Sequence, residues 1–147
     1  ESYPVRINAE AAVKAAGFKL VDQVKIEWDG DPQPEIAGAC DDDGMIRLCI
    51  IEEQAKRRFA IEHLLPSSGG TKLGKIEPVD LLSPDNIQEV VLETYTENPD
   101  EKIKRIRIYT GYREPRELFT SVIFRNKDKS KRPKWDCYFY IRIKTAF

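Results

Sequence analysis

The sequence predicts an α+β domain in which a helix-hairpin-helix half, residues 1–66, packs on a mostly antiparallel sheet of about four strands within residues 75–147. Residues 134–145 alternate apolar and polar side chains with the period of two that a strand requires. Three earlier segments resemble this one, and their connections are short enough for an antiparallel meander. In the first half, an Asp-Gly turn precedes apolar residues at helical spacing, which predicts a hairpin followed by a helix.

The composition is that of one folded domain, residues 1–147. With 41% hydrophobic residues, the chain can form one core, and its aromatic content argues against disorder. No run of about eighteen apolar residues is present, so we expect no membrane span. Cys40, Cys49 and Cys137 have no recognised spacing, which favours buried thiols in a reducing compartment over a disulfide framework. We therefore predict a cytoplasmic protein.

The first half begins with a predicted helix, a strand and a hairpin. Asn8 is a suitable N-cap and Gly17 a suitable C-terminal residue for a helix of about two turns. Partial alternation predicts a strand from Phe18 to Trp28. Asp43-Gly44 favours a tight turn and predicts a hairpin from Ile36 to Ile51.

A second helix is expected from Glu52 to Leu65, because Ala55, Phe59 and His63 would share one stripe on it. Pro66 would end this helix. A short strand is expected within Lys75–Leu82. The strands of the predicted sheet then follow as Ile87–Glu97, Ile103–Thr110, Leu118–Arg125 and Trp135–Thr145.

One stretch resembles a known family. The strand I-R-L-C-I-I, followed by E-E-Q-A-K-R-R-F-A-I-E-H-L-L, is similar to the ImmA/IrrE-type metallopeptidases, as is the preceding I-A-G-A-C-D-D-D-G, so the resemblance covers about residues 5–66. In that family a helix reads R-R-F-x-x-A-H-E-x-x-H. The resemblance matches Arg57, Arg58 and Phe59 to the lead-in and His63 to the first zinc ligand. In another register, R-F-A-I-E-H-L-L-P resembles a later helix of the family.

The chemistry of that family is not preserved. An HExxH zinc site needs a second His one turn later and a Glu that activates water. Leu64 stands where that Glu would be, and the chain has one His. The resemblance therefore implies a zinc-free relative that acts in regulatory protein-protein interaction.

No other catalytic motif is complete. Asp41, Asp42 and Asp43 are best explained as turn residues. The acidic residues that follow Pro84 lack the acidic-x-Lys element of metal-dependent nucleases, and Gly69-Gly70 does not have the spacing of a P-loop. We predict no catalytic residues, no metal and no cofactor. A metal-dependent hydrolase whose site is not recognisable in the sequence is kept as an alternative.

Charge is unevenly distributed. Residues 75–101 contain eight acidic residues and one basic residue, whereas residues 102–147 contain fourteen basic and four acidic residues, a net charge of plus ten. This asymmetry indicates either a polyanionic partner or internal pairing of the acidic segment with the basic one.

The basic segment supplies the predicted site of a non-enzymatic binding module. If its strands point their cationic and aromatic residues to one side, Arg and Lys would neutralise phosphates while Tyr rings stack on bases, and the loop 127–134 would add a basic arm. The partner would be nucleic acid or an acidic protein surface, and the oligomeric state is open. The alternative is an ordinary solvent face covered by the acidic segment. The predicted binding residues are Arg105, Arg107, Tyr109, Lys129, Lys131, Arg132, Lys134, Tyr138, Tyr140, Arg142 and Lys144.

Overall fold

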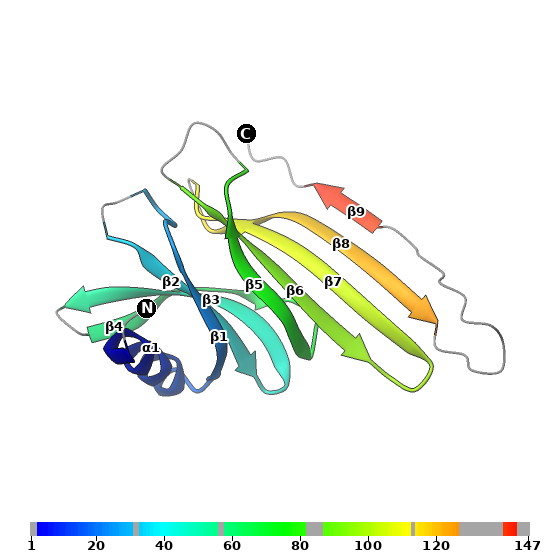
Figure 1. Cartoon of the computed structure of the whole chain (residues 1–147), viewed down its shortest axis with the longest axis horizontal. Helices are drawn as coiled ribbons and strands as arrows, with labels where there is room; N and C mark the ends of the chain where they lie inside the picture. Colours follow the sequence, from blue (N-terminus) through cyan, green and yellow to red (C-terminus); the bar gives the residue numbers. More distant parts are fainter. Residues whose placement is uncertain are drawn as a thin grey trace.

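The part of the chain that the structure describes folds into two antiparallel sheets and one helix (Figure 1). The computed structural model describes residues 3–30, 33–55, 58–81, 87–112, 114–126 and 140–143. Within these residues the protein is mostly β, so the predicted α+β fold with a helix-hairpin-helix half is wrong. No helix in the described part of the chain is long and apolar enough to cross a membrane. The cytoplasmic location stays a prediction.

The first sheet has the strand order β1-β2-β3-β4, and the helix α1 packs against β1 and β4. The helix and the first strand were both expected, but the helix begins earlier in the chain than Asn8. The elements of this half are α1 Tyr3–Ala15, β1 Lys19–Ile26, β2 Glu35–Asp42, β3 Met45–Ala55 and β4 Arg58–Ser67.

The second sheet is a meander in which each strand pairs with the next one in the sequence. The antiparallel meander predicted for this half is confirmed, and the short strand expected within Lys75–Leu82 overlaps β5, which joins the sheet as a fifth strand at its edge. In Figure 1, β5 lies nearest the first sheet and β9 lies farthest from it. The strands are β5 Lys72–Val79, β6 Glu89–Glu97, β7 Glu101–Thr110, β8 Arg116–Asn126 and β9 Tyr140–Ile143.

The hairpin between β2 and β3 is confirmed. Asp43 and Gly44 have φ angles of 51° and 88°, the left-handed conformation that a two-residue hairpin turn requires. The Asp41 carboxylate accepts a hydrogen bond of 2.7 Å from the backbone N–H of Gly44. The turn residues that the sequence singled out therefore set the register of this hairpin.

The helix predicted from Glu52 to Leu65 is wrong, because this stretch forms the end of β3 and most of β4. Ala55, Phe59 and His63 are spaced by four residues, and a spacing of four fits a strand period of two as well as a helical stripe. Phe59 packs under α1 together with Ile61, two residues later. Tertiary packing against α1 thus favours the strand.

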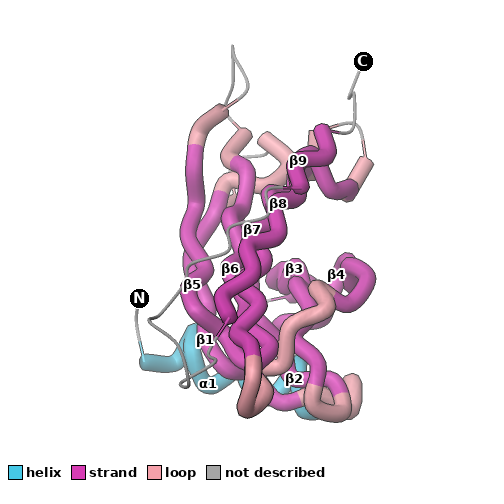
Figure 2. The backbone as a smooth tube through the Cα atoms, turned by 90° about the vertical axis from the view of Figure 1, so that its right-hand side faces the viewer, coloured by secondary structure: helices cyan, strands magenta, loops and turns pink. Residues whose placement is uncertain are grey.

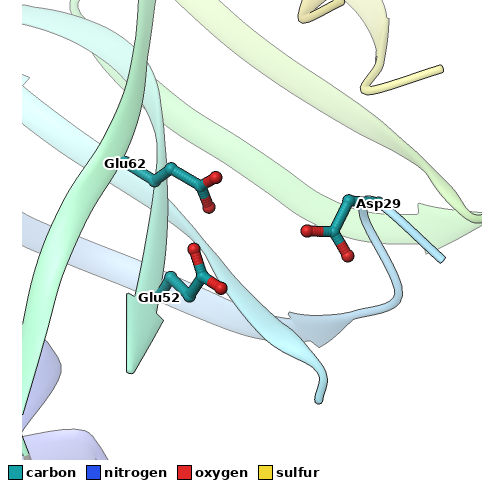
Figure 3. Close-up of side chains that lie close together, drawn as sticks. All are labelled: Asp29, Glu52 and Glu62. Atoms are coloured by element: carbon teal, nitrogen blue, oxygen red, sulfur yellow. The ribbon is translucent and has the colours of Figure 1, made fainter. Parts of the chain in front are cut away.

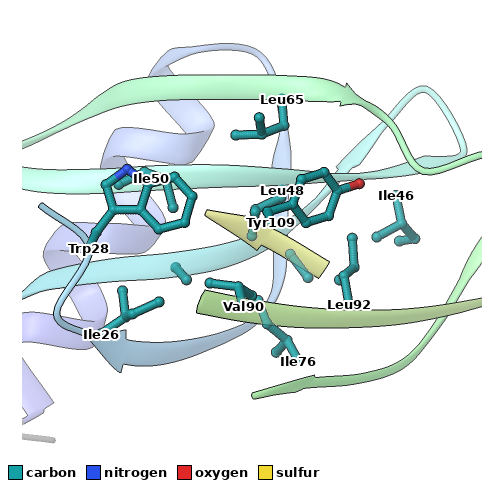
Figure 4. Close-up of a cluster of buried hydrophobic side chains, with 12 residues drawn as sticks. Ile26, Trp28, Ile46, Leu48, Ile50, Leu65, Ile76, Val90, Leu92 and Tyr109 are labelled. Atoms are coloured by element: carbon teal, nitrogen blue, oxygen red, sulfur yellow. The ribbon is translucent and has the colours of Figure 1, made fainter. Parts of the chain in front are cut away.

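The protein has three layers, namely α1, the first sheet and the second sheet, with a core on each side of the first sheet. One core lies between the sheets, where Trp28 is the largest fully buried side chain (Figure 4). The other lies beneath α1 and includes Ala9 and Val13 of the helix. Figure 2 shows the two sheets in a view that is turned by 90° from that of Figure 1.

Cys40 and Cys49 form a disulfide beneath α1, and their Cα atoms are 6.6 Å apart. Burial of both residues was expected, but the prediction of free thiols is wrong for this pair. Gly38 pairs with Cys49 and Cys40 pairs with Arg47, so the two cysteines are diagonal neighbours on one face of the hairpin. Their spacing therefore becomes informative only when the hairpin register is known. Cys137 lies outside the described residues.

Candidate anion-binding face of the second sheet

The register of the second sheet brings four of the predicted binding residues into two neighbouring rows. Paired residues of an antiparallel sheet share one face, and alternate pairs return to the same face. By backbone register, the arginines of β7 therefore lie on the same face as two residues of β9. The rows are Thr94–Arg105–Val122–Tyr140 and Leu92–Arg107–Thr120–Arg142.

This face is the one that the second sheet turns toward the first. Leu92 belongs to the core between the sheets, as does Tyr109, which is two residues beyond Arg107 on β7 (Figure 4). Tyr109 is only 3% exposed, and burial raises the pKa of its hydroxyl. The Tyr109 ring is therefore part of the core and is not open for stacking on a base.

A loop between β4 and β5 lies over the arginines. Its backbone is fixed at both ends, because the N–H of Ser68 donates to the carbonyl of Ile46 and the N–H of Thr71 donates to the carbonyl of Tyr95. Gly70 packs so closely on Thr94 that a Cβ atom there would lie 2.2 Å from the Thr94 hydroxyl oxygen. This position therefore requires glycine, and the loop is held against the sheet.

Arg107 has two partners on this face. Its Nη1 donates to Oε1 of Glu117 at 2.8 Å, and its Nε donates to the carbonyl of Ser68 at 2.9 Å. The side chains of Arg107 and Glu117 are 22% and 17% exposed, so the ion pair is largely withdrawn from water. Glu117 thus neutralises Arg107.

Within the described part of the chain, Arg105 has no such counter-ion. Its Nη1 donates to the hydroxyl of Thr96 at 2.9 Å, and that hydroxyl donates to the carbonyl of Gly69 at 3.1 Å. No described carboxylate forms an ion pair with it. Burial, followed by the charge of Arg107, lowers the pKa of Arg105. Arg105 therefore carries a partly buried positive charge that no acidic side chain in the described residues offsets.

A threonine hydroxyl beside the arginines also lacks a hydrogen bond. Thr120 stands opposite Arg107, is 7% exposed, and its Oγ1 has no partner among the described residues. A buried polar group left unsatisfied costs about 1 to 3 kcal/mol. Among the described residues, this face therefore holds an arginine without a carboxylate partner, Arg105, and a buried hydroxyl without a hydrogen bond, that of Thr120.

The opposite face of the second sheet is where acidic and basic segments pair. Lys104 lies 2.7 Å from the Glu93 carboxylate, and the Tyr95 hydroxyl donates to the same carboxylate at 2.9 Å. Burial raises the pKa of Glu93, but these two hydrogen bonds and the charges of Lys104 and Lys75 together hold the pKa below its ordinary value. Lys102 lies 4.3 Å from the centroid of the Tyr95 ring. The acidic segment thus pairs with basic residues on this face, away from Arg105.

The other predicted binding residues are not placed. For Tyr140 and Arg142 the structure describes the backbone alone, as part of β9. The rest lie outside the described residues, namely Lys129, Lys131, Arg132, Lys134, Tyr138 and Lys144.

A carboxylate cluster in the first sheet was not anticipated from the sequence. Asp29, Glu52 and Glu62 come from a loop, β3 and β4, and oxygens of the three lie within 4.8 Å of one another (Figure 3). Glu62 is the extra residue where the β3–β4 register shifts, and His63 Nε2 lies 3.5 Å from its carboxylate. Exposed acidic groups often lie this close without an ion, so we assign the cluster no role.

The cluster perturbs one of its members. A hydrogen bond with Glu62, then burial, then the charges of Glu62 and Asp29 raise the pKa of Glu52 to about 7. The expected helix from Glu52 to Leu65 hid the cluster, because it placed Glu52 and Glu62 on one element and not on two paired strands. A strand interpretation would have placed Glu52 and Glu62 on adjacent strands, but Asp29 is brought in by the tertiary fold alone.

Replacing Glu52 with Gln is expected to stabilise the protein in a pH-dependent way. Because the folded-state pKa is raised from 4.5 to about 7, ionising Glu52 destabilises the fold, and this loss grows as pH rises between those values. Because Glu52 is partly exposed, solvent screening reduces the effect of this shift, so Glu52→Gln should raise the melting temperature at pH 8 by a few degrees, equivalent to ~1 kcal/mol, and leave it unchanged at pH 4. Circular dichroism melts at both pH values measure this. Glu53→Gln is the control, and an equal gain at both pH values would contradict the prediction.

Comparison with protein-family models, curated proteins and solved structures finds no match. A role for this chain therefore has to be argued from its own geometry. The resemblance to the ImmA/IrrE-type metallopeptidases stays an untested prediction. The stretch that carries it includes β4, a strand where that family would have its zinc-binding helix.

Proposed function

We propose that this chain is a non-enzymatic binding module that takes an anionic partner on the arginine face of the second sheet, defined by Arg105, Arg107, Tyr140 and Arg142. The observation that carries this proposal is the state of Arg105. Its charge is partly buried, the charge of Arg107 further lowers its pKa, and no described carboxylate pairs with it. Burying a charge without a counter-ion is costly, and a bound anion would offset that cost.

The register supports the same face. Arg142 is in the row of Arg107, and Tyr140 is in the row of Arg105, so three cationic positions and one aromatic position are grouped across three strands. Because β8 lies between β7 and β9, paired positions on these two strands are about 10 Å apart across the sheet, and alternate residues along one strand are about 7 Å apart. Such spacings suit a partner with several closely spaced anionic groups. The net charge of plus ten over residues 102–147 favours the approach of such a partner.

A single-stranded nucleic acid is the partner that we favour, because its phosphates suit guanidinium groups and its bases suit the aromatic and apolar positions of the rows. Val122 and Ile103 supply apolar positions on this face beside Arg105. An acidic protein surface would meet the arginines but would make less use of the apolar positions.

Arg105→Ala is expected to weaken binding of a single-stranded oligonucleotide about tenfold, since a hydrogen bond to a charged group contributes about 1.5 to 3 kcal/mol. Fluorescence anisotropy at two salt concentrations measures this, with a duplex and a polyglutamate peptide as competitors. Lys102→Ala is the matched control, because it removes the same charge from the opposite face.

Two results would contradict the proposal. One is an absence of binding to any of the three polyanions even at low salt, where phosphate contacts are strongest. The other is an equal loss in Arg105→Ala and Lys102→Ala, which would indicate general charge attraction and no defined face. Preference for polyglutamate over the oligonucleotide would keep the face but change the partner to an acidic protein.

A further inference from the structure

Glu117 is paired with one arginine of the proposed face, Arg107, and its carboxylate is an anionic group, as the groups of the partner would be. Its carboxylate accepts from Arg107 Nη1 at 2.8 Å, while Arg107 Nε is held by the carbonyl of Ser68. The Nη1 group of Arg107 is thus directed at an internal carboxylate. Arg105, two residues earlier on the same strand and face, has no carboxylate partner among the residues that the structure describes. The two arginines therefore differ in whether an anion is already in place.

A β-bulge puts Glu117 in this position. Ile108 pairs with Phe119, and in a regular ladder Tyr109 would then pair with Leu118. The register shifts between Ile108 and Tyr109, so that Glu117 stands opposite Tyr109 instead. A shift of one residue moves a side chain to the other face of a sheet, and bulges are known to re-aim side chains at functional sites. The bulge therefore brings a carboxylate, in place of a leucine, to the face of Arg107.

We infer that Glu117 is a built-in competitor, which holds Arg107 where a second anionic group of the partner would otherwise bind. The inference rests on the proposed function and concerns the regulation of the same face. Charge balance supports it. Of the two β7 arginines, Arg107 is paired with the Glu117 carboxylate, and Arg105 has no carboxylate partner among the described residues, so Arg105 is the arginine of β7 at which an anionic group can bind as the face stands. A second group can use Arg107 fully only when the Glu117 carboxylate is displaced or neutralised.

Glu117→Gln is the direct test, because the amide keeps the size of the side chain and can still accept from Arg107 but carries no charge. With Arg107 released from a charge-assisted pair, the affinity for a single-stranded oligonucleotide should rise about tenfold. One more phosphate contact should also steepen the dependence of log K on log salt by about 0.7. Anisotropy titrations at several salt concentrations give both quantities, and circular dichroism checks that the variant is folded.

Two further variants separate this effect from general electrostatics. Glu114→Gln removes the same charge from an exposed residue just before β8 and should leave both affinity and salt slope nearly unchanged. Adding Arg107→Ala to Glu117→Gln should abolish the gain, because the released arginine is then absent. If the gain survives in that double variant, or if Glu114→Gln shows it equally, Glu117 is not a competitor at Arg107.

The outcomes also separate this inference from the proposed function. Binding by the wild type with no gain in Glu117→Gln would overturn the inference and leave the proposed function standing. Binding by Glu117→Gln alone would support both, with the wild type held in an inhibited form. No binding by either protein at low salt would overturn both.

Discussion

Replacing Trp28 with Ala is expected to lower the free energy of unfolding by about 3 to 5 kcal/mol, the range for large aromatic residues removed from a core. Trp28 is 1% exposed and packs in the cluster that joins the two sheets. Its backbone N–H donates to the buried Glu35 carboxylate at 3.1 Å, so the residue is also fixed at the main chain. Gly111 lies so close to the ring that a Cβ atom there would be 2.6 Å from the indole. The ring is thus tightly packed, and its removal should leave a cavity in this core.

Urea denaturation followed by circular dichroism measures this loss. Leu81→Ala is the control, because Leu81 is 56% exposed and its truncation should change stability by less than about 0.5 kcal/mol. A Trp28→Ala protein that loses less than about 1 kcal/mol would show that the two sheets do not depend on this contact.

The second large effect is expected from the disulfide. Cys40 and Cys49 are nine residues apart, and closing a loop of that size in the unfolded chain contributes about 2 to 3 kcal/mol. Both residues are fully buried beneath α1, so replacing them with Ala should also loosen the helix from the first sheet. The double variant Cys40→Ala, Cys49→Ala is therefore expected to unfold at lower urea concentration than the oxidised protein.

Reductant supplies the comparison for this prediction. Dithiothreitol should lower the stability of the wild type toward that of the double variant and should have little effect on the double variant itself. A double variant as stable as the oxidised wild type would contradict the prediction.

Local signals in the sequence predicted the parts of the fold that depend on local structure. Asp43-Gly44 sets a turn by its own conformational preference, and strict alternation with short connections predicts the meander of the second sheet. The stretch Glu52–Leu65 was mispredicted because its apolar spacing fits helix and strand equally. Contacts with α1, which are distant in the sequence, decide between them.

In the candidate site too, only the features that depend on local alternation were predicted from the sequence. Alternation placed Arg105 and Arg107 on one face of their strand. The register of β9 decides whether Tyr140 and Arg142 lie on the same face, and the observed pairing puts them there. Alternation also put Tyr109 on that face, but it does not say where the core ends along a strand. The position of Glu117 depends on a bulge, which breaks the period of two without a clear mark in the sequence.

The order of the strands also bears on how the protein folds. Every ladder in the described residues joins strands that are consecutive in the chain. Neither sheet therefore requires pairing between strands that are far apart in the sequence. Proteins dominated by such neighbouring contacts fold faster than β-proteins with long crossovers, because each closure costs the entropy of a short loop. Each sheet is therefore a local folding unit. The side chains between them, with the loop that carries Ser68 over Arg107, make the two units cooperative, so that the arginine face is completed when the sheets dock.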